Sequence, residues 1–432
     1  MLPLLAGLIA APITITHVSL IDLEKGRAVP DQTIVIDGGR FVAIGNSDEV
    51  PVSKAARVVD GKGLYAIPGL WDMHIHAADP RHFSLFTANG VTGVRDMFGS
   101  PIHLAWRTQF DQGRSIGPKM VVAGPIVDGP TPIWPGSIAV GNYEEGREAV
   151  KKIVAGGYDF VKVYSLLPAD GYRGIVDEAK ASKIPFAGHI PNSVSVVDTA
   201  RSGQRSGEHT NGLIKLADKP YEFALAISEM KAQKMAWCPT LTVLRAIANL
   251  KDPKFTADPR LKYMPKWMID RWDPANDFRF KSWTSEQWAK MKRDYGTALR
   301  LTKQLHQSGI LLLAGTDCLN PYCFPGFSLH DELELLVEAG LSNRDALRTA
   351  TFNVGDYLRR RVGRIQVGYE ADLVLLDANP LEKIGNTRKV RQVVQRGILF
   401  ERKELDAMLE AAVAAAGSAP PASGGFLPDC DY

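Results

Sequence analysis

Short apolar runs recur through the middle of the chain, and stretches with helical spacing, such as 143–155, 171–182 and 193–202, separate most of them. The apolar runs number eight: 70–76, 90–97, 119–125, 159–164, 185–189, 206–209, 237–243 and 310–317. Strands that alternate with helices pair in parallel, and eight such strands close into a barrel. The pattern therefore predicts an α/β chain whose residues 68–362 form a (β/α)8 TIM barrel.

Both ends of the chain show a different pattern, in which apolar and polar residues alternate over short runs. Residues 13–67 contain several such runs between Asp-Gly-Gly and Gly-Asn turn signals, and residues 363–399 contain a second patch of them. We therefore expect residues 12–67 and 363–402 to form one small composite β-sandwich domain. Residues 403–432 are predicted to form an alanine-rich helix and a flexible tail.

One connection is far longer than the others, because residues 244–300 separate the seventh apolar run from the eighth. It carries half of the chain's eight tryptophans: Trp267, Trp272, Trp283 and Trp288. Long insertions at the catalytic face of a barrel often act as lids or substrate walls. A subunit interface in a homo-oligomer is the competing interpretation.

Composition points to a small-molecule partner. The 432 residues are 45% hydrophobic and 23% charged, with a net charge of +3, and they contain no basic block or arginine-rich arm. These features do not favour a nucleic acid as the partner. No apolar run reaches the roughly 18 residues that an integral membrane segment needs.

The first eleven residues, MLPLLAGLIAA, resemble the apolar region of an export signal without its basic start. We therefore expect a periplasmic or secreted enzyme, with a cytoplasmic one as the alternative. Four cysteines do not decide between these compartments. Cys318 and Cys323 are close enough in sequence to close a small disulfide ring, or they are two small buried residues.

Residues that can bind a metal stand at or near the ends of these runs. His74 and His76 end the first run at positions i and i+2, so both imidazoles project from one face of a strand. Four more such residues follow at later runs: Lys162, His189, His209 and Asp317. Strand ends meet at the catalytic face of a barrel, so these side chains should converge there. An apolar strand with two chance histidines is the alternative for the first pair.

Six ligands suit two divalent ions better than one, since a single catalytic zinc ion normally takes three protein ligands and water. His74, His76 and Asp317 would hold the first ion, and His189 and His209 the second. Lys162 would then bridge the two. An ammonium group cannot bind a metal, so Lys162 would have to react with carbon dioxide and become a carbamate. An ordinary salt-bridging lysine is the alternative.

These residues lie in motifs that resemble those of the amidohydrolase superfamily, in its imidazolonepropionase-like and prolidase-like (Xaa-Pro dipeptidase-like) branch. The motifs are His74-x-His76, Phe-Val-Lys162-Val-Tyr, Ala-Gly-His189, Gly-Glu-His209 and Ala-Gly-Thr-Asp317. The similarity extends from about residue 13 to 397. It implies a binuclear centre, usually of Zn2+, whose bridging hydroxide attacks a carbonyl carbon. In that mechanism Asp317 takes the proton of the hydroxide and passes it to the leaving amine.

Two further residues are candidates for catalysis. Tyr164 lies two residues beyond Lys162, on the same strand face, and could donate a hydrogen bond to the developing oxyanion. His330 follows the eighth run and could contact substrate. The competing interpretations are an aromatic residue at the barrel rim for Tyr164 and a histidine near a helix N-terminus for His330.

Substrate cannot be transferred from any one relative, because a bulky Ser165-Leu-Leu-Pro168 segment follows Tyr164 where many relatives have a glycine-rich loop. We expect hydrolysis of the amide bond of a dipeptide or N-acyl amino acid. Arg245 is a candidate for pairing with the carboxylate of that substrate. The alternatives are the opening of a cyclic amide at the same centre and, more distantly, a metal-free binding or scaffold protein.

Overall fold

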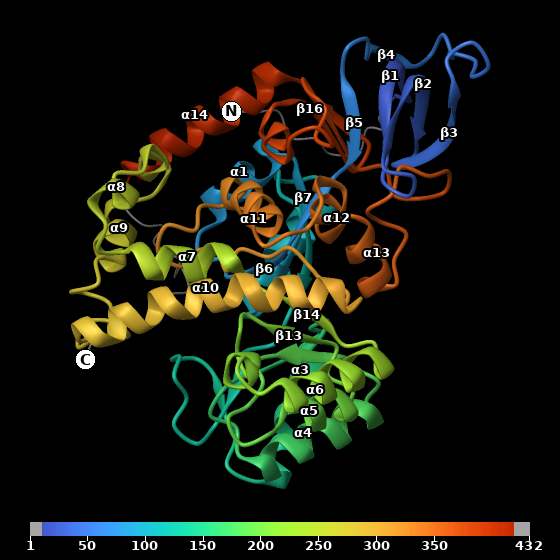
Figure 1. Ribbon diagram of the computed structural model, residues 1–432. Helices are drawn as coiled ribbons and strands as arrows, with labels where there is room; N and C mark the ends of the chain where they lie inside the picture. Colours follow the sequence, from blue (N-terminus) through green and yellow to red (C-terminus); the bar gives the residue numbers. More distant parts are fainter. Residues whose placement is uncertain (1–10, 419–432) are drawn as a thin grey trace.

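The computed structural model describes residues 11–418 (Figure 1). Of the predicted export signal only Ala11 falls within this range, and the predicted flexible tail lies outside it from residue 419 onwards. The predicted C-terminal helix is present as α14 (Arg402–Ala416). A search of the described residues for a helix long and apolar enough to cross a membrane finds none.

One sheet joins strands from both ends of the chain, in the order β17-β16-β15-β5-β1-β2-β3 with β4 beside β1. Its strands are β1 (Ile13–Asp22), β2 (Arg27–Asp37), β3 (Arg40–Asn46), β4 (Arg57–Asp60), β5 (Tyr65–Pro68), β15 (Leu373–Leu376), β16 (Val390–Gln395) and β17 (Ile398–Phe400). The two ends meet where Leu373 of β15 faces Pro68 of β5 in an antiparallel register. Alternating apolar residues of both ends, including Ile15, Ile34 and Leu373, share one buried core. One sheet thus contains strands from both ends of the chain, while the predicted composite β-sandwich domain stays a prediction.

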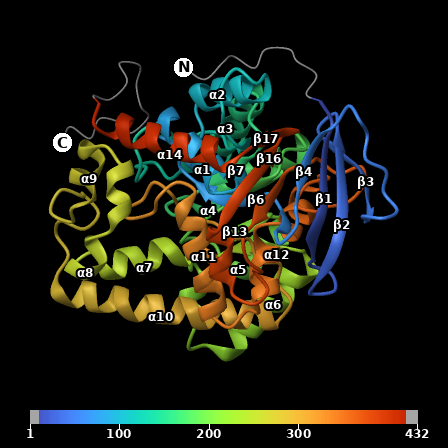
Figure 2. The ribbon, with the colours of Figure 1, turned by 90° about the horizontal axis from the view of Figure 1, so that it is seen from above.

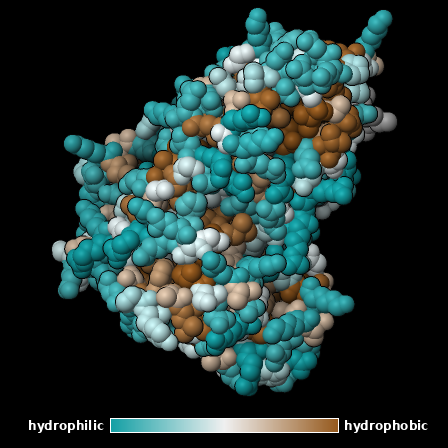
Figure 3. Space-filling view, turned by 45° about the vertical axis from the view of Figure 1, so that its right-hand side comes forward, coloured by the Kyte–Doolittle hydropathy of each residue, from teal (hydrophilic) through white to brown (hydrophobic). Residues whose placement is uncertain are grey.

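Some apolar side chains of this end of the molecule remain at the surface. Figure 3 shows apolar residues gathered over it, and Val42, Val58 and Val367 are each about half exposed. Single exposed valines are common on protein surfaces. We attach no function to them.

The middle of the chain forms two parallel sheets, and nearly all of their strand residues outside Ile138–Ala139 are buried. The first contains β6 (Leu70–Ile75), β7 (Val91–Asp96) and β8 (Lys119–Val122), in that order. The second has the order β10-β9-β11-β12-β13-β14, with β9 (Val127–Asp128), β10 (Ile138–Ala139), β11 (Val161–Val163), β12 (Phe186–Gly188), β13 (Ser206–Glu208) and β14 (Ala236–Cys238). Near-continuous apolar runs are typical of such doubly covered strands.

Seven of the eight predicted strands are therefore present, while run 310–317 forms no extended ladder. It makes isolated parallel bridges from Leu312 to Trp237 and, one residue past its end, from Cys318 to Ile75. A third bridge joins Ala123 to Phe160, between the two parallel sheets. The chain is thus α/β, but its sheet topology alone does not establish a closed barrel.

Helices cover the parallel sheets and fill the long insertion (Figures 1 and 2). They are α1 (Phe83–Ala88), α2 (Pro101–Asp111), α3 (Tyr143–Ala155), α4 (Ala169–Ala181), α5 (Val196–Ser202), α6 (Pro220–Ala232), α7 (Leu241–Asn249), α8 (Pro253–Thr256), α9 (Lys266–Trp272), α10 (Ser285–Gln307), α11 (Phe327–Glu338), α12 (Asn343–Thr349) and α13 (Phe352–Leu358). Short 3-10 turns are η1 (Pro80–His82), η2 (Leu213–Leu216), η3 (Pro259–Tyr263) and η4 (Ile384–Arg388).

The insertion packs onto the body of the protein through its own apolar residues. Met268 and Trp272 share a buried cluster with Leu85 of α1 and Phe324, which precedes α11. Trp288 of α10 is buried in a second, smaller cluster. The predicted roles of the insertion, as a substrate wall or as a subunit interface, stay predictions.

Cys318 and Cys323 are both free and buried, as is Cys238. The predicted alternative of a disulfide ring is therefore not the arrangement in this structure. The two cysteines occupy small apolar positions beside the segment that carries Asp317, as the second interpretation expected.

Candidate metal centre

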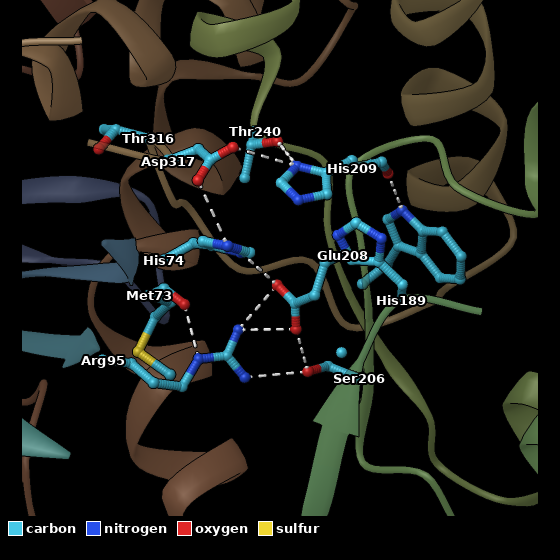
Figure 4. Close-up of polar contacts among 12 residues, drawn as sticks. Met73, His74, Arg95, His189, Ser206, Glu208, His209, Thr240, Thr316 and Asp317 are labelled. Carbon is cyan, nitrogen blue, oxygen red and sulfur yellow. Dashed lines mark hydrogen bonds and ion pairs between the residues drawn. The ribbon is translucent and has the colours of Figure 1, made fainter. Parts of the chain in front are cut away.

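The six predicted ligands all lie at or near the carboxyl ends of parallel strands. His74 lies in β6, His76 follows that strand, and Lys162 lies in β11. His189 and His209 come directly after β12 and β13, and Asp317 precedes the bridge at Cys318. Figure 4 shows His74, His189, His209 and Asp317 turned toward one another.

The distances place the four histidines and Asp317 in one cluster. Asp317 Oδ1 lies 2.9 Å from His76 Nε2 and 3.5 Å from His74 Nε2. His74, His209 and Asp317 satisfy the spacing of a metal site. The ring centroids of His209 lie 4.7 Å from those of His74 and 4.9 Å from those of His189. The two histidine pairs that the sequence assigns to different ions are therefore neighbours.

A close approach of two backbones makes this cluster possible. A Cβ atom added to Gly315 would lie 2.9 Å from the backbone nitrogen of His74 and 2.5 Å from Cys238 Sγ. Both are closer than real Cβ contacts. Only glycine at this position lets the segment that carries Asp317 lie against His74.

The cluster fits a divalent ion better than it fits internal hydrogen bonding. His74 Nε2 and Lys162 Nζ are buried without a hydrogen-bond partner among the described residues. Buried polar atoms normally have partners, and those that do not call for an explanation such as an ion. Two ligand atoms about 2.1 Å from one tetrahedral zinc ion are about 3.4 Å apart. The separations around Asp317 are close to this value.

Three of the histidines meet a polar side chain at Nδ1. For His74 and His189 this contact leaves Nε2 as the ligand atom, whereas His209 Nδ1 also lies 3.8 Å from Asp317 Oδ2. His74 Nδ1 lies 2.8 Å from Glu208 Oε2, and His189 Nδ1 lies 2.7 Å from Ser165 Oγ. His209 Nδ1 lies 2.6 Å from Thr240 Oγ1.

The partner of His74 belongs to a fully buried ion pair. Arg95 Nη2 donates to both oxygens of Glu208, at 2.9 and 3.0 Å, and its Nε donates to the carbonyl oxygen of Met73. Ser206 Oγ donates to Glu208 at 2.6 Å. Arg95 therefore supports both the carboxylate that meets His74 and the strand residue beside it (Figure 4).

Sequence reasoning did not assign these supporting residues. Glu208 stands directly before a predicted ligand in the Gly-Glu-His209 motif, and that position was the available signal. Arg95 lies in a buried apolar run, where a lone charge indicates an internal partner. Thr240 gave no signal, because its contact with His209 depends on the fold.

Burial keeps three of the four histidines in the neutral form that binds metals. It lowers the pKa of His74 and His189 well below the usual range, and the positive charge of Lys162 lowers both further. It also lowers the pKa of His209 to about 4. Lys162 is therefore near a histidine of each pair.

Lys162 itself is buried, and burial lowers its pKa to about 8 against the opposing charges of Glu208 and Asp317. The neutral amine is the form that reacts with carbon dioxide. Burial raises the pKa of Asp317, but the neighbouring His209, His76 and Lys162 outweigh it, so this pKa stays below its usual range.

Tyr164 lies at the cluster, whereas His330 has contacts elsewhere. The Tyr164 ring stacks on His189, with 4.0 Å between centroids. His330 is buried in α11, with Nδ1 3.0 Å from Thr387 Oγ1 and Nε2 3.0 Å from the carbonyl oxygen of Asn89. Both of its nitrogens are thus engaged away from the ligands, and its proposed contact with substrate has no support from these bonds.

Arg245, the candidate for binding a substrate carboxylate, lies in α7 and faces the buried Asp331 instead. Its Nη2 lies 3.5 Å from Asp331 Oδ2, and the same carboxylate accepts hydrogen bonds from Arg260 and Arg388, each at 2.7 Å. These contacts favour a structural role for Arg245. Its role toward substrate stays a prediction without support from these contacts.

A buried cluster of neutral imidazoles, a lysine and a carboxylate at strand ends defines a metal-binding hydrolase site. Comparison with known proteins agrees: the sequence profile of the amidohydrolase family matches residues 65–399, so the chain belongs to this family. The predicted superfamily is confirmed, and so is the prediction of a hydrolase that acts on carbon–nitrogen bonds.

The solved structures similar to this chain extend over nearly its whole length. Bottromycin amidohydrolase is 23% identical, with a TM-score of 0.78 over 96% of this chain and 92% of its own. A Xaa-Pro dipeptidase with bound methionine in the active site is 18% identical, with a TM-score of 0.70 over 90% of this chain and 100% of its own. These neighbours imply a fold of the TIM-barrel type.

Among curated proteins, the ochratoxinase of Aspergillus niger is 21% identical over 90% of this chain and 87% of its own length. Its solved structure has a TM-score of 0.70 to this chain. The chain is therefore similar to enzymes whose names point to different amide substrates.

Proposed function

We propose that this enzyme hydrolyses the amide bond of a dipeptide or an N-acyl amino acid at a centre of two divalent ions. The observation that carries the proposal is the buried cluster itself, in which His74 Nε2 and Lys162 Nζ have no hydrogen-bond partner among the described residues. The names of the bottromycin amidohydrolase and Xaa-Pro dipeptidase neighbours support the choice of peptide-like amides.

In this proposal His74, His76 and Asp317 hold the first ion, and His189 and His209 hold the second. Lys162, as a carbamate, would be a ligand of both ions, and both would be Zn2+. The imidazole and carboxylate donors are those that zinc prefers. When bound, the ions would supply an activated water molecule and polarise the scissile carbonyl group.

The protein's own groups would handle the proton and the developing charge. Asp317, 7% exposed, would take the proton from the attacking water and pass it to the leaving nitrogen. Burial raises the pKa of Tyr164 to about 12, so its hydroxyl stays protonated at neutral pH and can donate to the oxyanion.

The remaining parts of the architecture are proposals of the same kind. Isolated bridges support a closed (β/α)8 barrel, because they link the two parallel sheets at both edges. At one edge Ala123 bridges Phe160; at the other, Leu312 bridges Trp237 and Cys318 bridges Ile75. The shared sheet of β1–β5 and β15–β17 supports a composite domain built from both chain ends. Export to the periplasm or the medium stays a proposal from the sequence.

One hydrolysis screen tests the function. Zinc-loaded enzyme is incubated with dipeptides, N-acyl amino acids, cyclic imides and lactones, and released products are followed by mass spectrometry. We expect turnover of the first two classes. Turnover confined to cyclic imides would replace the proposal with ring opening, and no turnover of any amide would overturn it.

A further inference from the structure

The long insertion reaches the candidate centre through one short segment, Asp277-Phe278-Arg279-Phe280, which we call the insertion tip. Its partner is Trp134, in the loop between β9 and β10. The Phe278 ring packs edge-to-face on Trp134, with 5.5 Å between centroids, and the Arg279 guanidinium lies 5.3 Å from the Trp134 centroid. Trp134 is thus covered from two directions by the insertion.

Arg279 fixes the insertion tip to the segment that carries Asp317. Its Nε and Nη2 donate to the Asp277 carboxylate, and its Nη1 donates to Asn320 Oδ1 at 2.7 Å. Asn320 in turn donates from Nδ2 to the backbone carbonyl oxygen of Asp317 at 2.9 Å. The insertion tip and the predicted metal ligand therefore belong to one hydrogen-bonded unit.

Trp134 fixes the hydroxyl group of Tyr164. Its Nε1–H donates to Tyr164 Oη at 2.9 Å, and an indole nitrogen can only donate. Tyr164 is therefore the acceptor in this bond, and its own proton is free to donate. Because the Tyr164 ring stacks on His189, this free donor lies beside the candidate centre.

The loop that carries Trp134 is itself held in place. The buried Asp128, at the end of β9, accepts hydrogen bonds from the backbone nitrogen of Ile133 at 3.1 Å and from that of Leu166 at 2.7 Å. One carboxylate thus ties the loop before Trp134 to the loop after Tyr164. The pair of rings is preorganised rather than brought together by substrate.

Phe278 is the residue of this arrangement that remains exposed to solvent. Its side chain is 43% exposed, although both neighbours in the insertion tip and the ring it contacts are tied down. A single exposed aromatic residue needs no explanation by itself. Here the exposed ring belongs to a wall that continues through Trp134 to Tyr164 and His189, which are predicted to act on the scissile bond.

We propose that Phe278 and Trp134 form a specificity wall that receives an aromatic or large apolar substituent of the amide substrate. In the same arrangement Trp134 is a positioning residue for Tyr164. Aromatic pairs contribute about 0.5–1.5 kcal/mol beyond the area they bury, which corresponds to as much as about tenfold in selectivity. This inference rests on the proposed function and names the substrates that the site would prefer.

The test compares matched substrates in the metal-loaded enzyme. The values of kcat/KM are measured for N-acetylphenylalanine, N-benzoylalanine and N-acetylalanine, so that an aromatic group is placed on either side of the amide. Phe278→Ala should lower at least one aromatic-to-small ratio by about tenfold. Tyr221→Ala is the control, because Tyr221 is an 80% exposed aromatic residue on α6, and its ratios should match those of the wild type.

The two proposals fail in different ways. Unchanged ratios in an active Phe278→Ala enzyme would overturn the wall and leave amide hydrolysis standing. If the wild type hydrolyses none of the three, the dipeptides of the screen decide the proposed function, and calorimetric binding of N-acetylphenylalanine decides the wall. Weaker binding to Phe278→Ala would support it, whereas equal binding, or none to the wild type, would overturn it.

The positioning role has its own readout. Trp134→Phe keeps an aromatic ring but removes the N–H donor, so kcat should fall while KM and the substrate ratios change little. Combined with Tyr164→Phe, it should cause no further loss, because the two residues act through one hydroxyl. Additive losses in the double variant would overturn this role.

Discussion

Replacing Glu208 with glutamine should weaken metal binding without touching a ligand. The Glu208 carboxylate meets three polar groups: His74 Nδ1 at 2.8 Å, Arg95 Nη2 at 2.9 Å and Ser206 Oγ at 2.6 Å. An amide has one acceptor oxygen and one N–H2 group, so it cannot accept at both ends. If its N–H2 faces His74, the imidazole proton moves to Nε2, and the ligand atom is lost.

The magnitude follows from the role of such partners. Loss of a side chain that orients a metal-binding histidine typically costs 10- to 100-fold in affinity, or about 1.4–2.7 kcal/mol. The substitution also leaves Arg95, which is 1% exposed, without its counter-charge. Breaking a buried ion pair costs about 3–5 kcal/mol of folding free energy. Both effects should therefore be measured on the same protein.

The assay is competition for zinc between the metal-free protein and a fluorescent chelator, with urea unfolding measured in parallel. Glu178→Gln is the matched control, because Glu178 pairs with Arg147 on helices α4 and α3, remote from the ligands. Glu208→Asp keeps the charge and should recover part of the affinity if glutamine folds poorly. Wild-type zinc affinity in a destabilised Glu208→Gln protein would refute the orienting role.

Three further outcomes are expected. Wild-type protein should contain close to two divalent ions per chain when the metal is measured by mass spectrometry. The Lys162→Ala protein should lose both metal and turnover. Full metal occupancy with normal activity in this variant would contradict the bridging role of Lys162. Thr240→Val should weaken zinc binding about fivefold, because one hydrogen bond contributes about 1 kcal/mol and the Thr240 hydroxyl lies 2.6 Å from His209 Nδ1. An unchanged zinc affinity would contradict the role of Thr240 in orienting His209. Burial lowers the pKa of His330 to about 3, whereas the same imidazole in the unfolded chain has a pKa of about 6.5. As the pH falls below about 6.5, His330 therefore takes up a proton in the unfolded chain but not in the folded protein. The folded state should lose about 2 kcal/mol between pH 7.5 and pH 5 from this group, and urea unfolding of His330→Asn should show a smaller loss than the wild type; an equal loss would exclude the mechanism.

The ligand cluster was predictable because each ligand carries a local signal that a general rule of the fold brings together. His74 and His76 show the i, i+2 spacing of a strand face, and His189 and His209 each follow a short apolar run. Parallel strands point their carboxyl ends at one face, so no knowledge of distant contacts was needed. The eighth run carried the same signal at Asp317, although its backbone forms only isolated bridges.

The residues that orient those ligands were not predictable in the same way. Glu208 meets His74 across 134 positions of sequence, and Thr240 meets His209 across 31. Such contacts depend on how neighbouring strands and helix starts are packed. His330 shows that a local signal can also lack support from the fold. A histidine after the eighth run looks like a site residue, but both of its nitrogens bond to Thr387 and Asn89, and its contact with substrate stays a prediction.

The difference between the ligands and the residues around them also explains why the metal centre says little about the substrate. Enzymes named for bottromycin, Xaa-Pro dipeptides and ochratoxin share this fold at 18–23% identity, so the fold alone does not determine which substrate an enzyme takes. The residues that select the substrate should therefore lie in the loops. In this chain the loop with Trp134 and the insertion tip with Phe278 meet at Tyr164, and Arg279 ties both to the backbone of Asp317 through Asn320. A change in the insertion tip should therefore alter selectivity first, while a change in Glu208 should alter metal affinity for every substrate equally.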